Sequence, residues 1–285
     1  MIHGLAIKPP EADLHALWSR CVIENIRVKN ETLAKALENR PEVLTHAYWA
    51  DATPHHIPDY RRYIRRLALQ VDKVIAARRE SGDAFHVGRG ERIGAFFKDR
   101  GLDLVNVFTR ALTIRDDVMK RYLVEARLYD EDQYIADRMR ERLEEELCAA
   151  WDDGRDVALI SHSMGTFIAY DVLWRFSHRA LDPWAKYRRK RVQMFVTMGS
   201  PLADSEIRDL LFARHHEARG TREFPTNIDR WHNYTCLGDV VSHEHNFEGD
   251  FFSEMKRLKL LPERPKHRAI DCSNLHNPFE VVSHG

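Results

Sequence analysis

The expected fold is decided by residues 156–173, which read DVALISHSMGTFIAYDVL. The first part, Val157–Ile160, is a short apolar run typical of a buried strand, and apolar residues recur after Gly165 at the spacing of a helix. A strand that turns at once into a helix, with Ser163 at the turn, exposes the hydroxyl and points the first N–H groups of the helix at whatever the serine attacks. Gly165 has no Cβ, so the helix can pack closely against the strand. The stretch predicts a nucleophilic serine; the alternative is a buried strand–helix junction that merely contains serines.

The turn itself, Ser161-His162-Ser163-Met164-Gly165, resembles the G-x-S-x-G pentapeptide of the α/β-hydrolase superfamily, with serine in place of the first glycine. We call residues 161–165 the elbow. The resemblance implies an α/β-hydrolase fold, with a mostly parallel central sheet and helices on both of its faces. It also implies that Ser163 is the nucleophile and that the backbone N–H of Met164 contributes to the oxyanion hole.

The N-terminal residues Met1–Pro10 begin apolar, continue with His3-Gly4 and stop at two prolines, which is typical of a strand end and a loop. In α/β-hydrolases a His-Gly pair ends the third strand, and the next residue lends its N–H to the oxyanion hole. The resemblance therefore implies Leu5 as the second oxyanion donor, with an ordinary turn as the alternative. Since only two residues precede His3, we expect the first strands of the fold to be missing or shortened.

A helix is expected within residues 11–40 and a strand at 43–49. The helix follows from apolar residues at helical spacing: Leu14, Leu17, Trp18 and Cys21. A His-Gly pair, a helix and a second strand match the α/β-hydrolase order. Residues 48–51, Tyr-Trp-Ala-Asp, also resemble a Tyr-Tyr-x-Asp run of a bacterial group of uncharacterised hydrolases with the same start.

The segment that follows, residues 59–150, is charged, helical in pattern and far longer than a usual connection of about 2–6 residues. We expect residues 54–130 to form a helical lid on a single domain spanning 1–285, followed by the helix that leads to the elbow strand. The basic residues at 61–66 could face a membrane surface, but the apolar side chains beside them favour an ordinary solvated helix.

Two further strands are expected at 192–198 and 231–237. The first ends in Thr-x-Gly-Ser-Pro-Leu, which resembles the strand after the nucleophile in lipase-like α/β-hydrolases. Ser200 could contact substrate there, but a helix entry capped by Ser200 is the favoured interpretation. The second ends at Gly238-Asp239, where α/β-hydrolases carry the catalytic acid. The resemblance implies that role for Asp239, with a turn aspartate as the alternative.

The last strand is expected at 267–272. In the superfamily the catalytic histidine lies in the loop after it, where both His276 and His284 qualify. Ser-His-Gly at 283–285 resembles the histidine loop of the same bacterial group, so His284 is favoured and His276 is the alternative base. The triad would then run Ser163, Asp239, His284, in the order of the superfamily.

The amino-acid composition excludes few classes of function. Lysine plus arginine and aspartate plus glutamate both number 44, so net charge offers no argument for a nucleic-acid partner. With no signal-peptide pattern and no apolar run of about 18 residues, we expect a cytoplasmic protein without stable membrane insertion. The four cysteines are widely spaced and contain no CxxC pair, which favours buried free thiols over disulfides.

Together these features predict a serine hydrolase that cleaves a small-molecule or lipid-like ester through an acyl-serine, without metal or organic cofactor. Carboxylester, lipid ester and thioester all remain open, as does the oligomeric state. One alternative is a hydrolase-fold protein that has lost catalysis and serves as a binding or scaffold module. Another is a metal hydrolase built on His243 and His245, although no further ligand cluster has the spacing to complete such a site.

Overall fold

The computed structural model describes residues 1–4, 8–52, 128–179, 184–203, 211, 219–236, 252–260 and 266–270. The helices in these ranges are α1 (Glu11–Arg27), α2 (Glu31–Glu38), α7 (Gln133–Asp152), α8 (Met164–His178) and α12 (Ser253–Arg257). The strands are β1 (Ala158–His162), β2 (Met194–Met198), β3 (Trp231–Cys236) and β4 (Lys266–Ile270). Short 3-10 helices are η1 (Pro41–Val43), η2 (Ala50–Ala52), η3 (Trp184–Tyr187), η4 (Pro201–Ala203) and η5 (Gly220–Glu223).

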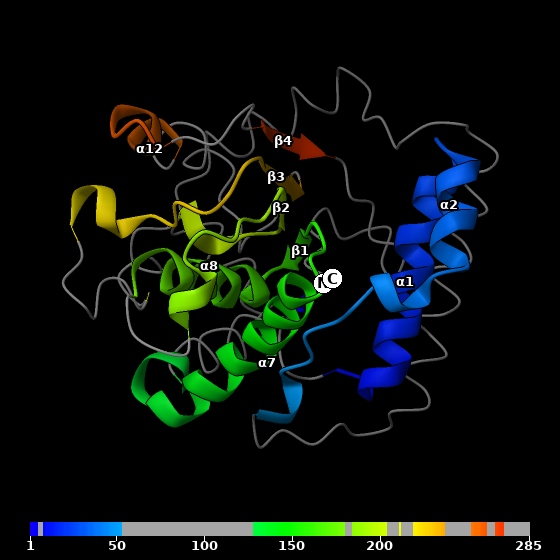
Figure 1. Cartoon of the computed structure of the whole chain (residues 1–285), viewed down its shortest axis with the longest axis horizontal. Coiled ribbons are helices and arrows are strands. Elements are labelled where there is room, and N and C mark those ends of the chain that lie inside the picture. The colour runs from blue at the N-terminus through cyan, green and yellow to red at the C-terminus, as the bar shows by residue number, and fades with distance from the viewer. Residues whose placement is uncertain are drawn as a thin grey trace, which may run out of the picture.

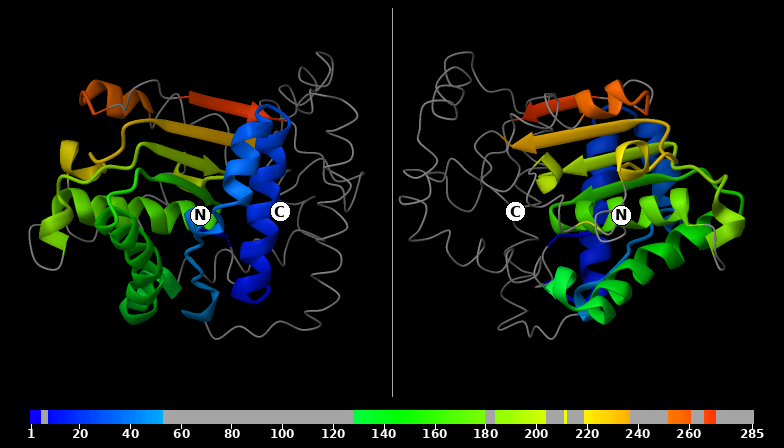
Figure 2. Two further views of the ribbon diagram at one scale, coloured as in Figure 1. Left: turned by 45° about the vertical axis from the view of Figure 1, so that its right-hand side comes forward. Right: turned by 90° about the vertical axis from the view of Figure 1, so that its left-hand side faces the viewer.

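The strands form one parallel sheet in the order β1-β2-β3-β4, and Figure 2 shows their arrows pointing the same way. The N-terminal residues extend the sheet past β1, because Ile2 forms parallel bridges with both Ser161 and Ala47. The Ile2 amide donates to the Ile160 carbonyl at 2.9 Å, and the Ala47 amide donates to the Met1 carbonyl at 2.8 Å. The expected α/β class with a parallel sheet is thus confirmed.

Helices cover the sheet on both sides, as expected. In Figure 1 the sheet is seen nearly edge-on, with α8 on one side and α1 and α2 on the other. Side chains along β1 alternate between these layers. Leu159 lies in the core under α8, whereas the His162 ring meets Trp18 of α1 at 6.4 Å between centroids.

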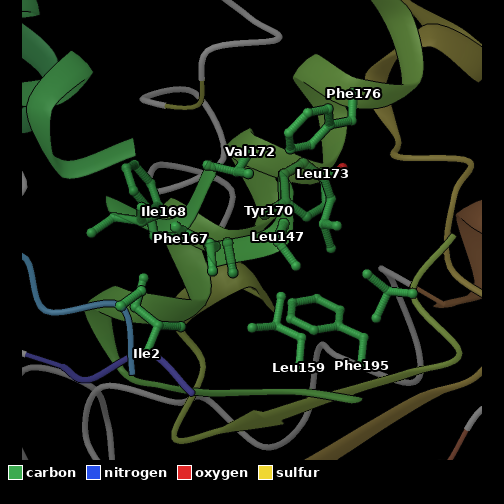
Figure 3. Packing of buried hydrophobic residues seen from close by; sticks show 14 of the residues in the cluster. Ile2, Leu147, Leu159, Phe167, Ile168, Tyr170, Val172, Leu173, Phe176 and Phe195 are labelled. Atoms are coloured by element: carbon green, nitrogen blue, oxygen red, sulfur yellow. The ribbon is translucent and has the colours of Figure 1, made fainter. Parts of the chain in front are cut away.

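The hydrophobic core lies between α8 and the sheet (Figure 3). Every residue of α8 from Met164 to Phe176 is buried, which is typical of a central helix that is packed on all sides. Phe167, Leu173 and Phe176 are fully buried, together with Leu159 and Phe195 from the strands below. This packing holds in place α8, the helix that follows Ser163.

The predicted elements differ from the structure in two places. The helix expected within 11–40 is two helices, because the Asn30 side chain accepts a hydrogen bond from the Leu33 amide at 3.0 Å and so starts α2. The strand expected at 43–49 pairs only at Ala47 among the described residues. Its start is part of η1, and the amide of Trp49 donates to the His3 ring instead of to a neighbouring strand.

The other expected strands are confirmed within one or two residues at each end, as is the helix that precedes the elbow. Of the expected lid at 54–130, the structure describes only residues 128–130, where Tyr129 is buried against Phe167 of α8. The rest of the lid and the domain boundary stay predictions that lie outside the described residues. Among the described helices, none has the length and apolar character that crossing a membrane requires.

Candidate functional site

Ser163 has an unusual backbone conformation. It joins β1 to α8 with φ 51° and ψ −126°, a sparsely populated region that costs on the order of 1–3 kcal/mol for a residue with a side chain. Lys259 also has positive φ, but it ends α12, where a left-handed residue is an ordinary helix terminus. Ser163 stands at the start of a helix, where no such explanation applies. Backbone strain of this kind is concentrated at functional positions.

Both backbone groups of Ser163 are held by neighbours. Its amide donates to the carbonyl of Met198 at the end of β2, at 2.9 Å. Its carbonyl accepts two hydrogen bonds from Thr166, one from the amide at 2.8 Å and one from the hydroxyl at 2.7 Å. The Thr166 hydroxyl also lies 3.0 Å from the hydroxyl of Ser200. Together these hydrogen bonds hold the turn at Ser163 in its strained conformation.

Two glycines permit close approaches around the elbow. A Cβ on Gly165 would lie 2.3 Å from the carbonyl oxygen of His3, so the tightest packing at Gly165 is with the N-terminal residues and not, as expected, with the strand that precedes the elbow. A Cβ on Gly4 would lie 2.9 Å from the Ser163 Cβ and 3.0 Å from Nδ1 of His162. Cβ atoms essentially never approach backbone or Cβ atoms this closely, so both positions require glycine.

His3 and Trp49 fix the turn that carries Gly4. The Trp49 amide donates to Nε2 of His3 at 3.1 Å, and the indole N–H donates to the His3 carbonyl at 2.9 Å. Nε2 accepts a hydrogen bond from the Trp49 amide and therefore carries no hydrogen itself. The hydrogen of the neutral ring is then on Nδ1, which donates to the Gly4 carbonyl at 2.9 Å. Burial holds the pKa of His3 well below its usual value, in keeping with this neutral tautomer.

The elbow lies at the point where the strand order reverses. From Ile2 the chain moves to Ala47 on one side, then returns to β1 on the other side and continues outward through β2, β3 and β4. Open parallel sheets bind ligands at the carboxyl ends of the strands at such a reversal. The residues at that point are Gly4 and Ser163.

A second group of rings lies on the α1 side of the elbow. His46 is 5.3 Å from His3 and 5.5 Å from Trp18 between ring centroids. It is 5 % exposed, and within the described part of the chain neither of its ring nitrogens has a hydrogen-bond partner. Burial lowers the pKa of His46 to about 3, with the nearby N-terminal ammonium, His15 and Lys8 acting in the same direction. The sequence patterns do not reveal this group, because its members are spread over the first 50 residues.

Ser200 has the capping role that the sequence favours. It precedes η4, with Pro201 as the first residue of that helix, and its hydroxyl accepts from the Leu202 amide at 3.4 Å. The side chain is buried, and its hydrogen bonds are made within the protein. The link to Thr166 has no signal in the sequence, since nothing local connects residues 166 and 200.

Of the predicted site residues, the structure places Ser163 and Met164 together at the elbow, with Gly4 against the serine. Four others lie outside the described residues: Leu5, Asp239, His276 and His284. His243 and His245 lie outside them as well. Within the described ranges, no three side chains of histidine, cysteine, aspartate or glutamate are grouped so as to hold a metal ion. Cys21 and Cys148 are free thiols, as expected, but half-buried rather than buried.

A buried charged network ties α7 to the back of α8. The Tyr129 hydroxyl donates to the Asp171 carboxylate at 2.7 Å, and the Arg140 guanidinium lies 3.7 Å from the same carboxylate. Arg175 pairs with Glu144 at 3.1 Å. Burial raises the pKa of Tyr129 well above its usual value, so the phenol remains a donor. This network supports α8 from the side away from the sheet.

Comparison with models of known families, with curated proteins and with solved structures found no match for the chain.

Proposed function

We propose that this chain is a serine hydrolase of the α/β-hydrolase type that cleaves an ester through an acyl-enzyme on Ser163. The observation that carries the proposal is the strained conformation of Ser163 between a parallel strand and a buried helix. Natural proteins retain such strain where the chemistry needs the side chain in one place. A merely structural junction could use a glycine here without the cost.

The order of the sheet supports the hydrolase fold. β2, the expected post-nucleophile strand, lies directly beside β1, and the His3-Gly4 segment lies on the other side of β1. The position of β2 is the one that the resemblance implies for the strand after the nucleophile strand. The close approach of Gly4 to Ser163 supports the further proposal that the next residue, Leu5, supplies an oxyanion donor.

The proposed reaction has two steps. A histidine, His284 or else His276, takes the proton from the Ser163 hydroxyl as its oxygen attacks the ester carbonyl carbon, and the alcohol leaves with that proton. Water then attacks the acyl-serine, the same histidine takes its proton and returns it to Ser163, and the acid is released. Asp239 would hold the histidine in the required tautomer. The N–H groups of Met164 and Leu5 would bind the oxyanion in both steps.

Hydrolysis of p-nitrophenyl acetate, butyrate and dodecanoate tests the proposal. We expect Ser163→Ala to lower kcat by about 10³-fold or more, and Asp239→Asn to lower it strongly. His284→Ala and His276→Ala are compared directly, and the variant that falls to the level of Ser163→Ala identifies the base. Full activity in Ser163→Ala would refute the assignment of the nucleophile. A folded wild-type protein that hydrolyses none of the esters would instead favour a binding protein on a hydrolase scaffold.

A further inference from the structure

We propose that the hydroxyl of Thr166 is a positioning group for the oxyanion hole, and that it acts through a directed chain of hydrogen bonds that begins at η4. This series of hydrogen bonds runs from the Leu202 amide to Ser200, from Ser200 to Thr166, and from Thr166 to the carbonyl of Ser163. It ends at the peptide that contains the Met164 N–H. The inference rests on the proposed function, because it concerns the stabilisation of an oxyanion formed by attack of Ser163.

The direction of each hydrogen bond follows from counting protons. The Thr166 hydroxyl has one hydrogen, which it donates to the carbonyl of Ser163 at 2.7 Å. In its 3.0 Å contact with Ser200 it must therefore accept, so Ser200 donates. The Ser200 oxygen in turn accepts from the Leu202 amide at 3.4 Å. Every donor in this series points toward the elbow.

Peptide planarity links the last bond to the oxyanion donor. The carbonyl of Ser163 and the N–H of Met164 belong to one rigid peptide unit and point in opposite directions across it. Fixing the carbonyl oxygen with two donors, the amide and the hydroxyl of Thr166, therefore fixes the direction of the Met164 N–H. Aligned hydrogen bonds also polarise one another, which makes the last N–H a stronger donor.

The carbonyl of Ser163 does not itself require this second donor. The carbonyl of Ser163 already accepts from the Thr166 amide, so the hydroxyl is not needed to satisfy it. The hydroxyl-bearing side chains of Thr166 and Ser200 are both buried, at 0 % and 1 % exposed. One buried hydroxyl donates to this carbonyl and the second donates to the first, beside a serine whose conformation is strained.

The test replaces Thr166 with valine, which has nearly the same shape and lacks the hydroxyl. We expect kcat for p-nitrophenyl acetate to fall about 10-fold or more, while KM changes by less than about 2-fold, because the interaction matters mainly in the transition state. The affinity for a trifluoromethyl ketone, which forms an oxyanion on the enzyme, should fall in parallel with kcat/KM. Thr166→Ser keeps the hydroxyl and should restore most of the rate.

Ser177→Ala is the matched control in the same helix. The Ser177 hydroxyl lies 2.8 Å from the Leu173 carbonyl and 2.9 Å from Oδ1 of Asn227, and its single hydrogen is donated to one of them at the far end of α8. We expect this variant to lose stability and to keep its kcat. If Thr166→Val does not fold, Ser200→Ala removes the preceding donor and is measured in the same way, with an expected loss of about 3-fold.

Wild-type kcat in folded Thr166→Val, or an equal loss in Ser177→Ala, would overturn the inference while leaving the proposed function intact. Failure of the wild-type protein to hydrolyse the ester would overturn the proposed function, and the inference with it. A fall in kcat without a parallel fall in trifluoromethyl ketone affinity would also refute it, because the hydroxyl would then not act on the oxyanion.

Discussion

Gly4 and Ser163 are so close that a Cβ on Gly4 would lie 2.9 Å from the Cβ of Ser163, although 159 positions separate them in the sequence. The contact is created by Ile2, which pairs with Ser161 and brings the N-terminal strand alongside β1. The backbone of Gly4 therefore lies directly against the side chain of Ser163 at its Cβ. Any side chain at this position would compete with the serine for the same space.

Gly4→Ala should therefore reduce reaction at Ser163. We expect the rate of reaction with a fluorophosphonate to fall by about 10-fold or more, because the new methyl group must displace either Ser163 or the turn that carries Gly4. Quenched labelling followed by intact mass measures this rate.

Gly154→Ala is the control for that experiment. Gly154 has φ 70°, and a Cβ added there would meet no atom of the described residues within 4 Å, so alanine strains the backbone without contacting the elbow. A loss of about 1 kcal/mol in the free energy of unfolding is expected, with an unchanged labelling rate. Equal labelling rates in Gly4→Ala and Gly154→Ala would contradict the role assigned to Gly4.

Gly165→Ala should act mainly on stability. Its Cβ would lie 2.3 Å from the carbonyl oxygen of His3. That oxygen belongs to the backbone, so it cannot move away by a change of side-chain rotamer. Either α8 or the N-terminal strand must move, so we expect the free energy of unfolding to fall by about 3 kcal/mol or more. Urea denaturation followed by fluorescence measures the change, and a loss below about 1 kcal/mol would mean that the strand is not packed here.

Features that depend on neighbouring residues could be predicted from the sequence. The strand, the elbow and α8 follow from neighbouring residues, and the break before α2 is marked by Asn30, a good helix cap that the periodicity argument passed over. Contacts between segments that are distant in the sequence could not be predicted. The expected strand at 43–49 is cut short because the Trp49 amide bonds to His3, a partner 46 residues away. The Thr166–Ser200 contact is equally non-local, and no spacing rule predicts it.

His46 should make the protein sensitive to acid. In the unfolded chain its pKa is near the ordinary 6.5, whereas burial lowers the folded value to about 3. Below pH 6.5 the unfolded state therefore binds more protons than the folded state, and stability falls progressively as the pH drops toward 3. His46→Phe removes this contribution and also removes two buried nitrogens that have no partner among the described residues. We expect it to unfold at lower pH than the wild type and to gain about 1 kcal/mol at neutral pH.

The pH dependence of unfolding by urea separates His46 from other groups. Some acid sensitivity should remain in His46→Phe, because the pKa of His3 is lowered by burial as well. Identical stability profiles for the wild type and His46→Phe between pH 6.5 and about pH 4 would show that His46 is not buried in its neutral form.

Tyr129→Phe should weaken the support of α8 without changing the chemistry. The variant removes the hydroxyl that donates to the buried Asp171 carboxylate at 2.7 Å. We expect a loss of about 1–3 kcal/mol in the free energy of unfolding, since the carboxylate loses a hydrogen bond that it cannot replace with water. Labelling at Ser163 should proceed at the wild-type rate. A slower rate with unchanged stability would mean that residue 129 acts on the elbow itself.

Reaction with a fluorophosphonate is the decisive test of whether Ser163 is an activated nucleophile. The serine oxygen displaces fluoride at phosphorus only when a base and oxyanion donors assist it. Intact mass and peptide mapping are applied to the wild type and to Ser163→Ala, with folding of both verified by circular dichroism. We expect one adduct per chain, located on Ser163 and absent from the variant. No adduct on the folded wild-type protein, or an adduct that persists in Ser163→Ala, would contradict this expectation.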